Sequence, residues 1–357
     1  MKQLLVFCRP GFETECGREL TDVAAWQGMF GFFQSRPSDG YVRFSLSGPE
    51  GPADLMARVQ LEDLVFARDW WQWLTDVALP PSDRVGAVLA ALRETVEVLP
   101  VCQRVDVRIP EANTDRDLGN FARKWVAPLA RALRGAQLLA EGGDQGRFRL
   151  EVLLPDFQTA ILGVSDARNR SPFNMGIPRL KLPADAPSRS ALKLEEAWKV
   201  FLSAERMAEV LGGGRKAVDL GAAPGGWTYQ LVRQGMMVSA IDNGPMDDGL
   251  MASGQVEHVR ADGFRWRPQR AVDWMVCDIV DQPRKTADLV ACWFEERLCR
   301  FSIFNLKLPM KKRYEEWLSC RELIESRLQA AGLCFRLRAR QLYHDREEIT
   351  CFLERLD

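Results

Sequence analysis

The chain has 357 residues, with 48 lysines and arginines, 49 aspartates and glutamates, and a formal net charge of -1. Hydrophobic residues make up 46% of the sequence, which excludes a mostly disordered protein, and the length predicts about two or three domains. The near-zero charge provides no molecule-wide basic field, so a nucleic-acid partner would have to use a local patch.

The cysteines and histidines narrow the chemistry further. The nine cysteines are odd in number and form no CxxC pair, which argues against a disulfide framework and a zinc ribbon. The two histidines, His258 and His344, lie far apart, so no histidine-rich metal centre is expected. The first apolar run, Leu4–Cys8, is too short for a signal peptide or a bilayer span. We therefore expect a cytoplasmic protein with no metal, no membrane contact and no obligatory protein partner.

The first half of the chain mixes strand-like runs with helical periods and predicts an α+β fold. A joint is expected near residues 47–52, where Gly48-Pro49-Glu50-Gly51-Pro52 supplies turn residues. The aromatic segment 66–73 is typical of a core, although such side chains could also stack on unpaired bases. The strand-like runs are Leu4–Cys8, Tyr41–Ser45, Arg104–Ile109 and Arg147–Leu154, and the helical periods are Glu13–Trp26, Asp83–Val98 and Leu118–Arg134.

Residues 171–190 contain four prolines and predict an extended linker. The segment from Ser165 to Lys193 is also basic, which fits either a solvated linker or a contact with a phosphate backbone. Its cations are Arg168, Arg170, Arg179, Lys181, Arg189 and Lys193, against Asp166 and Asp185.

After the linker, strands and helices alternate, which predicts an α/β domain with a doubly wound sheet. The expected strands are Ala217–Leu220, Met237–Ile241, Trp274–Cys277, Ser302–Leu306, Leu333–Leu337 and Thr350–Leu353, and the expected helices are Trp227–Arg233, Lys285–Glu296 and Tyr314–Gln329.

A small-residue loop, Asp219-Leu-Gly-Ala-Ala-Pro-Gly-Gly226, follows the first of these strands and leads into a helix. Such a loop lets a ligand approach the backbone, and Asp242 at the end of the next strand suits a ribose diol. The loop lacks the G-x-G-x-x-G spacing of dinucleotide sites, and its leading acid suits the cationic sulfonium of S-adenosylmethionine (SAM) better than a diphosphate. Asp262, after the third strand region, could accept a hydrogen bond from an adenine amino group.

Two further strands end in charged residues, at Asp278 and Lys307. The run from Lys307 to Arg313 carries four cations and no acid, and an isolated lysine at the end of an apolar strand would need partners. Methylation of an exocyclic base amine is excluded because the chain has no Asn/Asp-Pro-Pro-aromatic motif. Cys277 lies inside an apolar strand, so we interpret it as core and not as a nucleophile for cytosine C5 methylation.

These residues carry a family resemblance. Lys193, Asp278, Lys307 and Glu348 resemble, in this chain order, the K-D-K-E tetrad of Rossmann-fold RNA 2′-O-ribose methyltransferases. More narrowly, the whole chain resembles the bacterial 23S rRNA cytidine 2′-O-ribose methyltransferase (RlmM) family. The motifs that carry this resemblance are Arg9-Pro-Gly-Phe-Glu13, Ser171-Pro-Phe-Asn-Met-Gly-Ile-Pro-Arg-Leu180, Pro183-Ala-Asp-Ala-Pro-Ser-Arg-Ser190, Leu306-Lys-Leu-Pro-Met-Lys-Lys-Arg-Tyr-Glu-Glu316 and Arg340-Gln-Leu-Tyr-His-Asp-Arg-Glu-Glu348.

The resemblance implies a SAM-dependent enzyme that methylates a cytidine ribose in 23S rRNA, with Lys307 as the proton acceptor. It implies a ferredoxin-like subdomain at 1–50, a THUMP-like RNA-binding domain at 51–170, the linker at 171–190 and a Rossmann-like methyltransferase domain at 191–357. The choice of Glu348 over Glu347 for the tetrad rests only on its place before the last strand. The expected cofactor-binding residues are Ser190, Asp219, Gly221, Ala223, Pro224, Gly225, Gly226, Asp242, Asp262 and Asp278.

Three alternatives stay open: an inactive RNA-binding assembly factor, a 2′-O-methyltransferase of another RNA, and a small-molecule methyltransferase.

The proposed role of Lys307 as proton acceptor has a physical difficulty. A lysine with the reference pKa of about 10.4 is protonated at neutral pH, and acting as a base requires the neutral amine. Water exclusion by bound RNA and SAM would favour that form.

Overall fold

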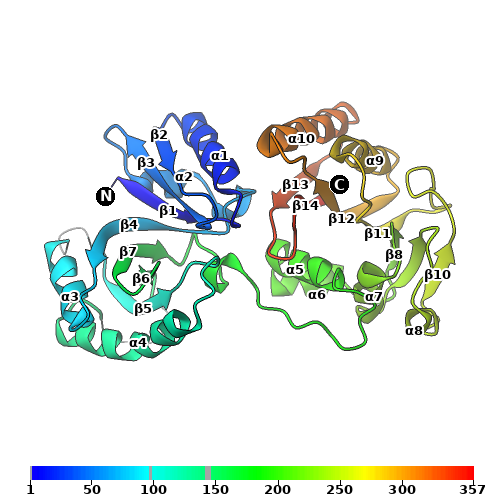
Figure 1. Ribbon diagram of the computed structural model, residues 1–357. Helices are drawn as coiled ribbons and strands as arrows, with labels where there is room; N and C mark the ends of the chain where they lie inside the picture. The colour runs from blue at the N-terminus through cyan, green and yellow to red at the C-terminus, as the bar shows by residue number, and fades with distance from the viewer. Residues whose placement is uncertain (1, 96–98, 141–145) are drawn as a thin grey trace. The chain divides into compact units, whose positions relative to one another are not determined.

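The structure is a computed structural model that describes residues 2–95, 99–140 and 146–357. The chain divides into two compact units, Met1–Gly176 and Ile177–Asp357, and each has its own sheet (Figure 1). Within the described ranges, no helix has both the length and the apolar character that a bilayer crossing requires.

One seven-stranded sheet runs through the first unit in the order β2-β3-β1-β4-β7-β6-β5. Its pairs are antiparallel except for β5 and β6. The central strand β4 pairs with both β1 and β7, so the expected subdomains 1–50 and 51–170 share one sheet, and their boundary stays a prediction. The strands are β1 (Gln3–Phe7), β2 (Phe30–Gln34), β3 (Tyr41–Ser47), β4 (Asp69–Ala78), β5 (Cys102–Arg108), β6 (Phe148–Leu153) and β7 (Thr159–Asp166).

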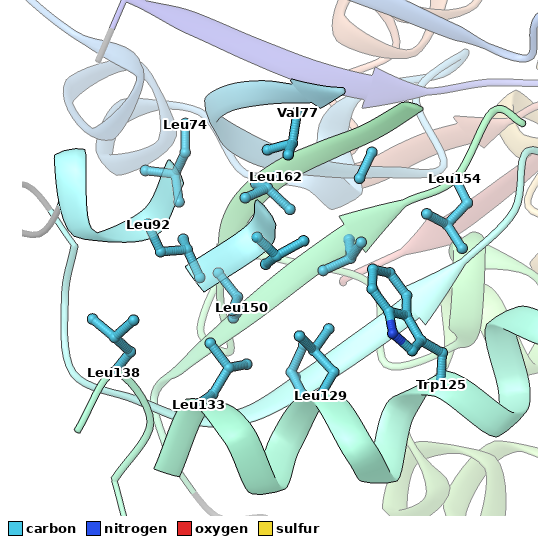
Figure 2. Close-up of a cluster of buried hydrophobic side chains, with 14 of the residues drawn as sticks. Leu74, Val77, Leu92, Trp125, Leu129, Leu133, Leu138, Leu150, Leu154 and Leu162 are labelled. Atoms are coloured by element: carbon cyan, nitrogen blue, oxygen red, sulfur yellow. The ribbon is translucent and has the colours of Figure 1, made fainter. Parts of the chain in front are cut away.

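Among the described residues of this unit, the α-helices are α1 (Glu13–Trp26), α2 (Pro52–Arg58), α3 (Arg84–Glu94) and α4 (Arg116–Gly135). The apolar residues of α4 recur every three or four positions, so they form one stripe that packs on β5, β6 and β7 (Figure 2). The predicted helix from Asp83 ends by Glu94, and residues 96–98 of that prediction lie outside the described residues. Phe66, Trp70 and Trp71 are fully buried, which confirms that this aromatic segment is core, although Trp73 is half-buried.

The second unit contains the predicted doubly wound sheet, in the order β10-β9-β8-β11-β12-β14-β13. The first five strands of this order are parallel, and β14 runs antiparallel to both β12 and β13. Met237–Ile241 has the predicted bounds, whereas the predicted strand at 333 begins at Phe335. The strands are β8 (Lys216–Leu220), β9 (Met237–Ile241), β10 (Val256–Val259), β11 (Val272–Cys277), β12 (Cys299–Lys307), β13 (Phe335–Arg340) and β14 (Glu348–Arg355).

Helices cover both faces of this second sheet (Figure 1). On one face, α5 and α7 bury an aromatic core in which the rings of Trp274 and Phe301 stack 4.9 Å apart. On the other face, α9 packs on β12 and against α10. The helices are α5 (Ala191–Phe201), α6 (Ala204–Val210), α7 (Gly226–Arg233), α8 (Asp248–Met251), α9 (Pro283–Glu295) and α10 (Arg313–Ala330).

Residues 177–190, which lead into α5, contain neither helix nor strand. The earlier part of the predicted linker belongs to the first unit, where the Ser171 N–H donates to the buried Asp69 carboxylate at 3.1 Å. The bounds 171–190 for the linker stay a prediction.

Candidate active site

The charged residues of the predicted tetrad meet at one edge of the second sheet. Asp278 directly follows the parallel strand β11, and Lys307 ends the parallel strand β12. Because β14 is antiparallel to β12, its first residue reaches the same edge, and Glu348 is the register partner of Lys307. The chain reverses its winding direction between β8 and β11, the position where open α/β sheets bind ligands.

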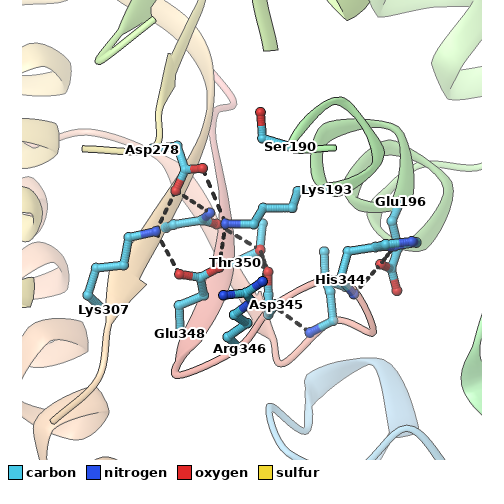
Figure 3. A network of polar contacts seen from close by, with 12 residues as sticks. Ser190, Lys193, Glu196, Asp278, Lys307, His344, Asp345, Arg346, Glu348 and Thr350 are labelled. Carbon is cyan, nitrogen blue, oxygen red and sulfur yellow. Dashed lines mark hydrogen bonds and ion pairs between the residues drawn. The ribbon is translucent and has the colours of Figure 1, made fainter. Parts of the chain in front are cut away.

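Two ammonium groups and two carboxylates alternate in this cluster (Figure 3). The Lys307 Nζ lies 2.5 Å from Asp278 Oδ1 and 2.6 Å from Glu348 Oε2. The Lys193 Nζ, from α5, lies 3.3 Å from Asp278 Oδ2 and pairs with Glu348 Oε1. Each lysine therefore contacts both acids, and each acid bridges both lysines. Glu347 instead pairs with Arg313 at 2.5 Å.

The cluster is partly buried, which strengthens its internal electrostatics. Burial alone would lower the pKa of Lys193, but Asp278 and Glu348 outweigh it and hold that pKa above its usual range. Burial would likewise raise the pKa of Asp278, yet Lys307 and Lys193 hold it below the usual range. The site therefore favours the charged forms of these two residues.

Sequence reasoning missed several buried polar residues behind the tetrad. The Asn305 amide, from the middle of β12, donates to Asp278 Oδ1 at 2.8 Å, and Thr350 and Asp345 lie behind Asn305. Glu196 accepts from the backbone N–H of Tyr343 and from both the backbone N–H and the ring Nδ1 of His344. A polar Asn305 inside the apolar run 301–306 is the signal that could have found this group.

Glycines shape the loop between β8 and α7. Gly225 has a φ of +120°, a conformation that residues with a Cβ rarely adopt. A Cβ on Gly226 would lie 2.1 Å from Ser190 Oγ, so this glycine permits the close approach of the start of α5. The loop backbone and Ser190 therefore lie close together, and a contact of either with a cofactor stays a prediction.

The predicted acids around the loop have different surroundings. The Asp242 carboxylate accepts from the backbone N–H groups of Ala223, at 3.0 Å, and Gly244, at 2.8 Å, and so ties the loop to the end of β9. Asp262 is exposed, and its carboxylate accepts from the Phe264 N–H within its own turn.

Asp219 is the most deeply buried of the four acids that are predicted to bind the cofactor. Its carboxylate is 1% exposed and accepts from the Thr228 hydroxyl of α7 at 2.6 Å. Burial raises the pKa of Asp219 to about 7, although the Thr228 bond opposes this shift. Its carboxylate therefore fixes the strand to the helix, and a contact with a cofactor stays a prediction.

In the part of the chain that the structure describes, no group of three or more His, Cys, Asp and Glu residues is arranged to bind a metal ion. Cys277 is fully buried, and burial raises the pKa of its thiol to about 12, which confirms its assignment to the core.

Three family models match the chain. They are the RlmM ferredoxin-like domain over residues 1–71, the N-terminal domain of ribosomal RNA large subunit methyltransferase M over residues 83–166, and the FtsJ-like methyltransferase over residues 186–310. These matches, with the observed sheets, confirm the predicted fold class: an α/β methyltransferase domain with a Rossmann-like sheet, preceded by an α+β region. None of the three descriptions names a THUMP domain, so that assignment stays a prediction.

Curated relatives match over the full length. Proteins named Ribosomal RNA large subunit methyltransferase M in Marinobacter nauticus, Pseudomonas syringae pv. syringae and Edwardsiella ictaluri are 63%, 45% and 46% identical. Each match covers 100% of this chain, and the matches cover 100%, 98% and 95% of the three relatives. Among solved structures, TrmN from Thermus thermophilus matches over 100% of both chains at 16% identity, with a TM-score of 0.37, which is too low to bear on function. By its similarity to the curated proteins, the chain belongs to the ribosomal RNA large subunit methyltransferase M family.

Proposed function

We propose that this protein is a methyltransferase of large-subunit rRNA that transfers the methyl group of SAM to the ribose 2′-hydroxyl of a cytidine. The observation that carries the proposal is the alternating cluster of Lys193, Asp278, Lys307 and Glu348 beside the glycine loop. A methyl transfer to a hydroxyl needs a group that takes up a proton, and Lys307 stands at the end of a strand where the ribose would approach. The resemblance of the long motifs to the RlmM family supports cytidine and 23S rRNA.

The loop region fits SAM as the methyl donor. The φ of +120° at Gly225 gives the loop a backbone turn that residues with a Cβ rarely adopt, and the partly buried carboxylate of Asp278 suits the positive charge of a sulfonium. Asp242 would hold the ribose diol of the donor, and Asp262 and Ser190 would make polar contacts at its rim. SAM supplies an electrophilic methyl group that is already activated for displacement.

Lys307 would accept the proton of the 2′-hydroxyl as the oxygen bonds to the methyl carbon and the carbon–sulfur bond breaks. S-Adenosylhomocysteine and the methylated ribose are the products. Lys193 lies on the other side of the same carboxylates, so it keeps them paired while Lys307 changes its charge. Exclusion of water by bound RNA disfavours the charged ammonium and prepares Lys307 to act as a base. Alignment of the two substrates supplies much of the remaining acceleration.

The direct test is methyl transfer from labelled SAM to purified large-subunit rRNA, with tRNA and small metabolites as competing acceptors. Mapping should locate the label on one cytidine ribose. Label found only in tRNA or only in metabolites would contradict the proposed substrate. RNA binding without any transfer would instead identify an assembly factor.

A further inference from the structure

A buried chain of polar side chains runs behind the tetrad, through three residues that hold no part in the proposed chemistry (Figure 3). Asp345, Thr350 and Asn305 are at most 1% exposed. The Thr350 Oγ1 lies 3.0 Å from Asp345 Oδ1, 3.1 Å from Asp345 Oδ2 and 2.8 Å from Asn305 Oδ1. The Asn305 Nδ2 donates to Asp278 Oδ1 at 2.8 Å. The chain therefore ends on the carboxylate that contacts both tetrad lysines.

The direction of these hydrogen bonds follows from counting protons. The Asp278 carboxylate can only accept, so the amide nitrogen of Asn305 must face it, and the amide oxygen must face Thr350. The single hydroxyl proton of Thr350 is then used by Asn305. No proton remains for the contact between Thr350 and Asp345 unless Asp345 carries it.

An ionised Asp345 would thus place two lone-pair-bearing oxygens of buried side chains about 3 Å apart with no hydrogen between them, which is unfavourable. A protonated Asp345 resolves this. One oxygen, Oδ2, accepts from the Leu342 N–H at 2.9 Å, and the other can carry a proton that it donates to Thr350.

We propose that Asp345 is a positioning residue in its neutral form, which donates to Thr350 and, through Thr350 and Asn305, fixes the Asp278 carboxylate against Lys307. This inference rests on the proposed function, because it assigns Asp278 and Lys307 to the reacting cluster.

The charged groups around Asp345 agree with the neutral form. Burial, together with the carboxylates of Glu348 and Glu196, raises the pKa of Asp345 to about 8, although the Leu342 N–H and Lys193 oppose this shift. The chain of bonds also explains why a polar Asn305 is tolerated inside an apolar strand, since both its amide nitrogen and its amide oxygen make a hydrogen bond.

Matched substitutions in the full-length protein test the proposal. Asp345→Asn keeps a neutral group of the same shape, with an amide that can donate to Thr350 and an oxygen that can accept from Leu342, so kcat should stay within about threefold of wild type. Asp345→Ala should lower kcat by about 30- to 100-fold while the KM for SAM changes little, because Asp278 loses its orientation. If the kcat of Asp345→Asn is lowered as much as the kcat of Asp345→Ala, a charged carboxylate is required and the proposal is wrong.

A second pair guards against variants that fold poorly. Thr350→Ser keeps the hydroxyl and should stay close to wild type, whereas Thr350→Val keeps the shape, loses the hydroxyl and should lose about 10- to 100-fold in kcat. Equal activities in the two variants would show that the hydroxyl plays no part.

Infrared spectroscopy gives a readout that needs no methyl acceptor. The spectrum of the wild type near neutral pH should contain a protonated-carboxyl C=O band that is missing from Asp345→Asn. If the wild type and Asp345→Asn have the same C=O bands in this region, Asp345 is not neutral and the proposal is wrong. A wild type that methylates no rRNA but shows this band would contradict the proposed function while leaving Asp345 neutral, so the two failures can be told apart.

Discussion

A cluster of buried charges around Arg108 in the first unit and the tetrad in the second unit are built differently. In the first unit, the Arg108 guanidinium lies 3.1 Å from Asp69, 3.2 Å from Glu151 and 3.6 Å from Asp106, and its side chain is 6% exposed. In the second unit, the tetrad lysines Lys193 and Lys307 are 16% and 18% exposed and each presents a single nitrogen.

The difference shows in protonation. Burial raises the pKa of Glu151 to about 7; Arg108 opposes the shift, whereas the neighbouring carboxylates of Asp106 and Asp69 add to it. In the tetrad, two ammonium groups face two acids, and the pKa of Asp278 is lowered despite its burial. A planar guanidinium that cannot lose its proton suits a fixed structural centre, whereas a lysine can exchange one. The balanced, accessible cluster is thus suited to chemistry, and the sealed one to holding a sheet together.

The largest expected effect comes from breaking the tetrad. Lys307→Met should lower the rate of methyl transfer by about 10²- to 10⁴-fold, because it removes the proton acceptor. Calorimetry should show SAM affinity close to that of the wild type. Lys199→Met, on the same helix as Lys193 but in a surface pair with Glu195, is the matched control and should keep full activity. Wild-type turnover by Lys307→Met would remove this residue from the mechanism.

Breaking the sealed cluster should affect folding instead. Arg108→Met leaves Asp69 and Glu151 buried without their cation and should lower the free energy of unfolding by about 3–5 kcal/mol, measured by urea denaturation. Arg58→Met, which breaks an exposed pair with Glu50, should cost about 1 kcal/mol or less. Equal losses in the two variants would contradict the structural role of Arg108.

A smaller effect is expected on the binding of SAM when Asp242 is replaced. Asp242→Ala removes the acceptor of two loop N–H groups and the proposed ribose contact, and should weaken SAM binding by about 10- to 100-fold. The measurement is the Kd for SAM by calorimetry. Asp288→Ala, in an exposed pair with Arg327, should leave that Kd unchanged. If both variants bind SAM like the wild type, Asp242 does not hold the donor.

The smallest expected effect is on the pH dependence of stability. Burial, Glu348 and Glu196 raise the pKa of Asp345 to about 8, although Lys193 opposes them. An aspartate in the unfolded chain has a pKa of about 3.9. The folded state therefore holds a proton that the unfolded state releases, and its stability falls as the pH rises between these values. As the pH rises from about 6 to about 9, the Tm of the wild type should fall, and the Tm of Asp345→Asn should fall by a few degrees less. Parallel Tm curves would contradict this assignment.

Local patterns in the sequence determined a large part of the fold. The helix Glu13–Trp26 and the strand Met237–Ile241 have the predicted bounds, because periodicity and the flanking turn residues lie within the segment itself. No residue range was predicted for the strands β2, β4, β7 and β10. All eight residues of β7 are half-buried or buried, without the alternation of a sheet that has one exposed face.

Of the candidate active site, the sequence indicated only that charged residues lie at the ends of apolar strands. The sequence alone did not distinguish Glu348 from Glu347, and the antiparallel register of β14 against β12 placed Glu348 opposite Lys307. Nor did the sequence reveal that Asn305, Thr350 and Asp345 would join behind the site. Periodicity reports which face a residue occupies, but partners that lie tens of positions apart, such as Lys193 and Asp278, are brought together only by the tertiary structure.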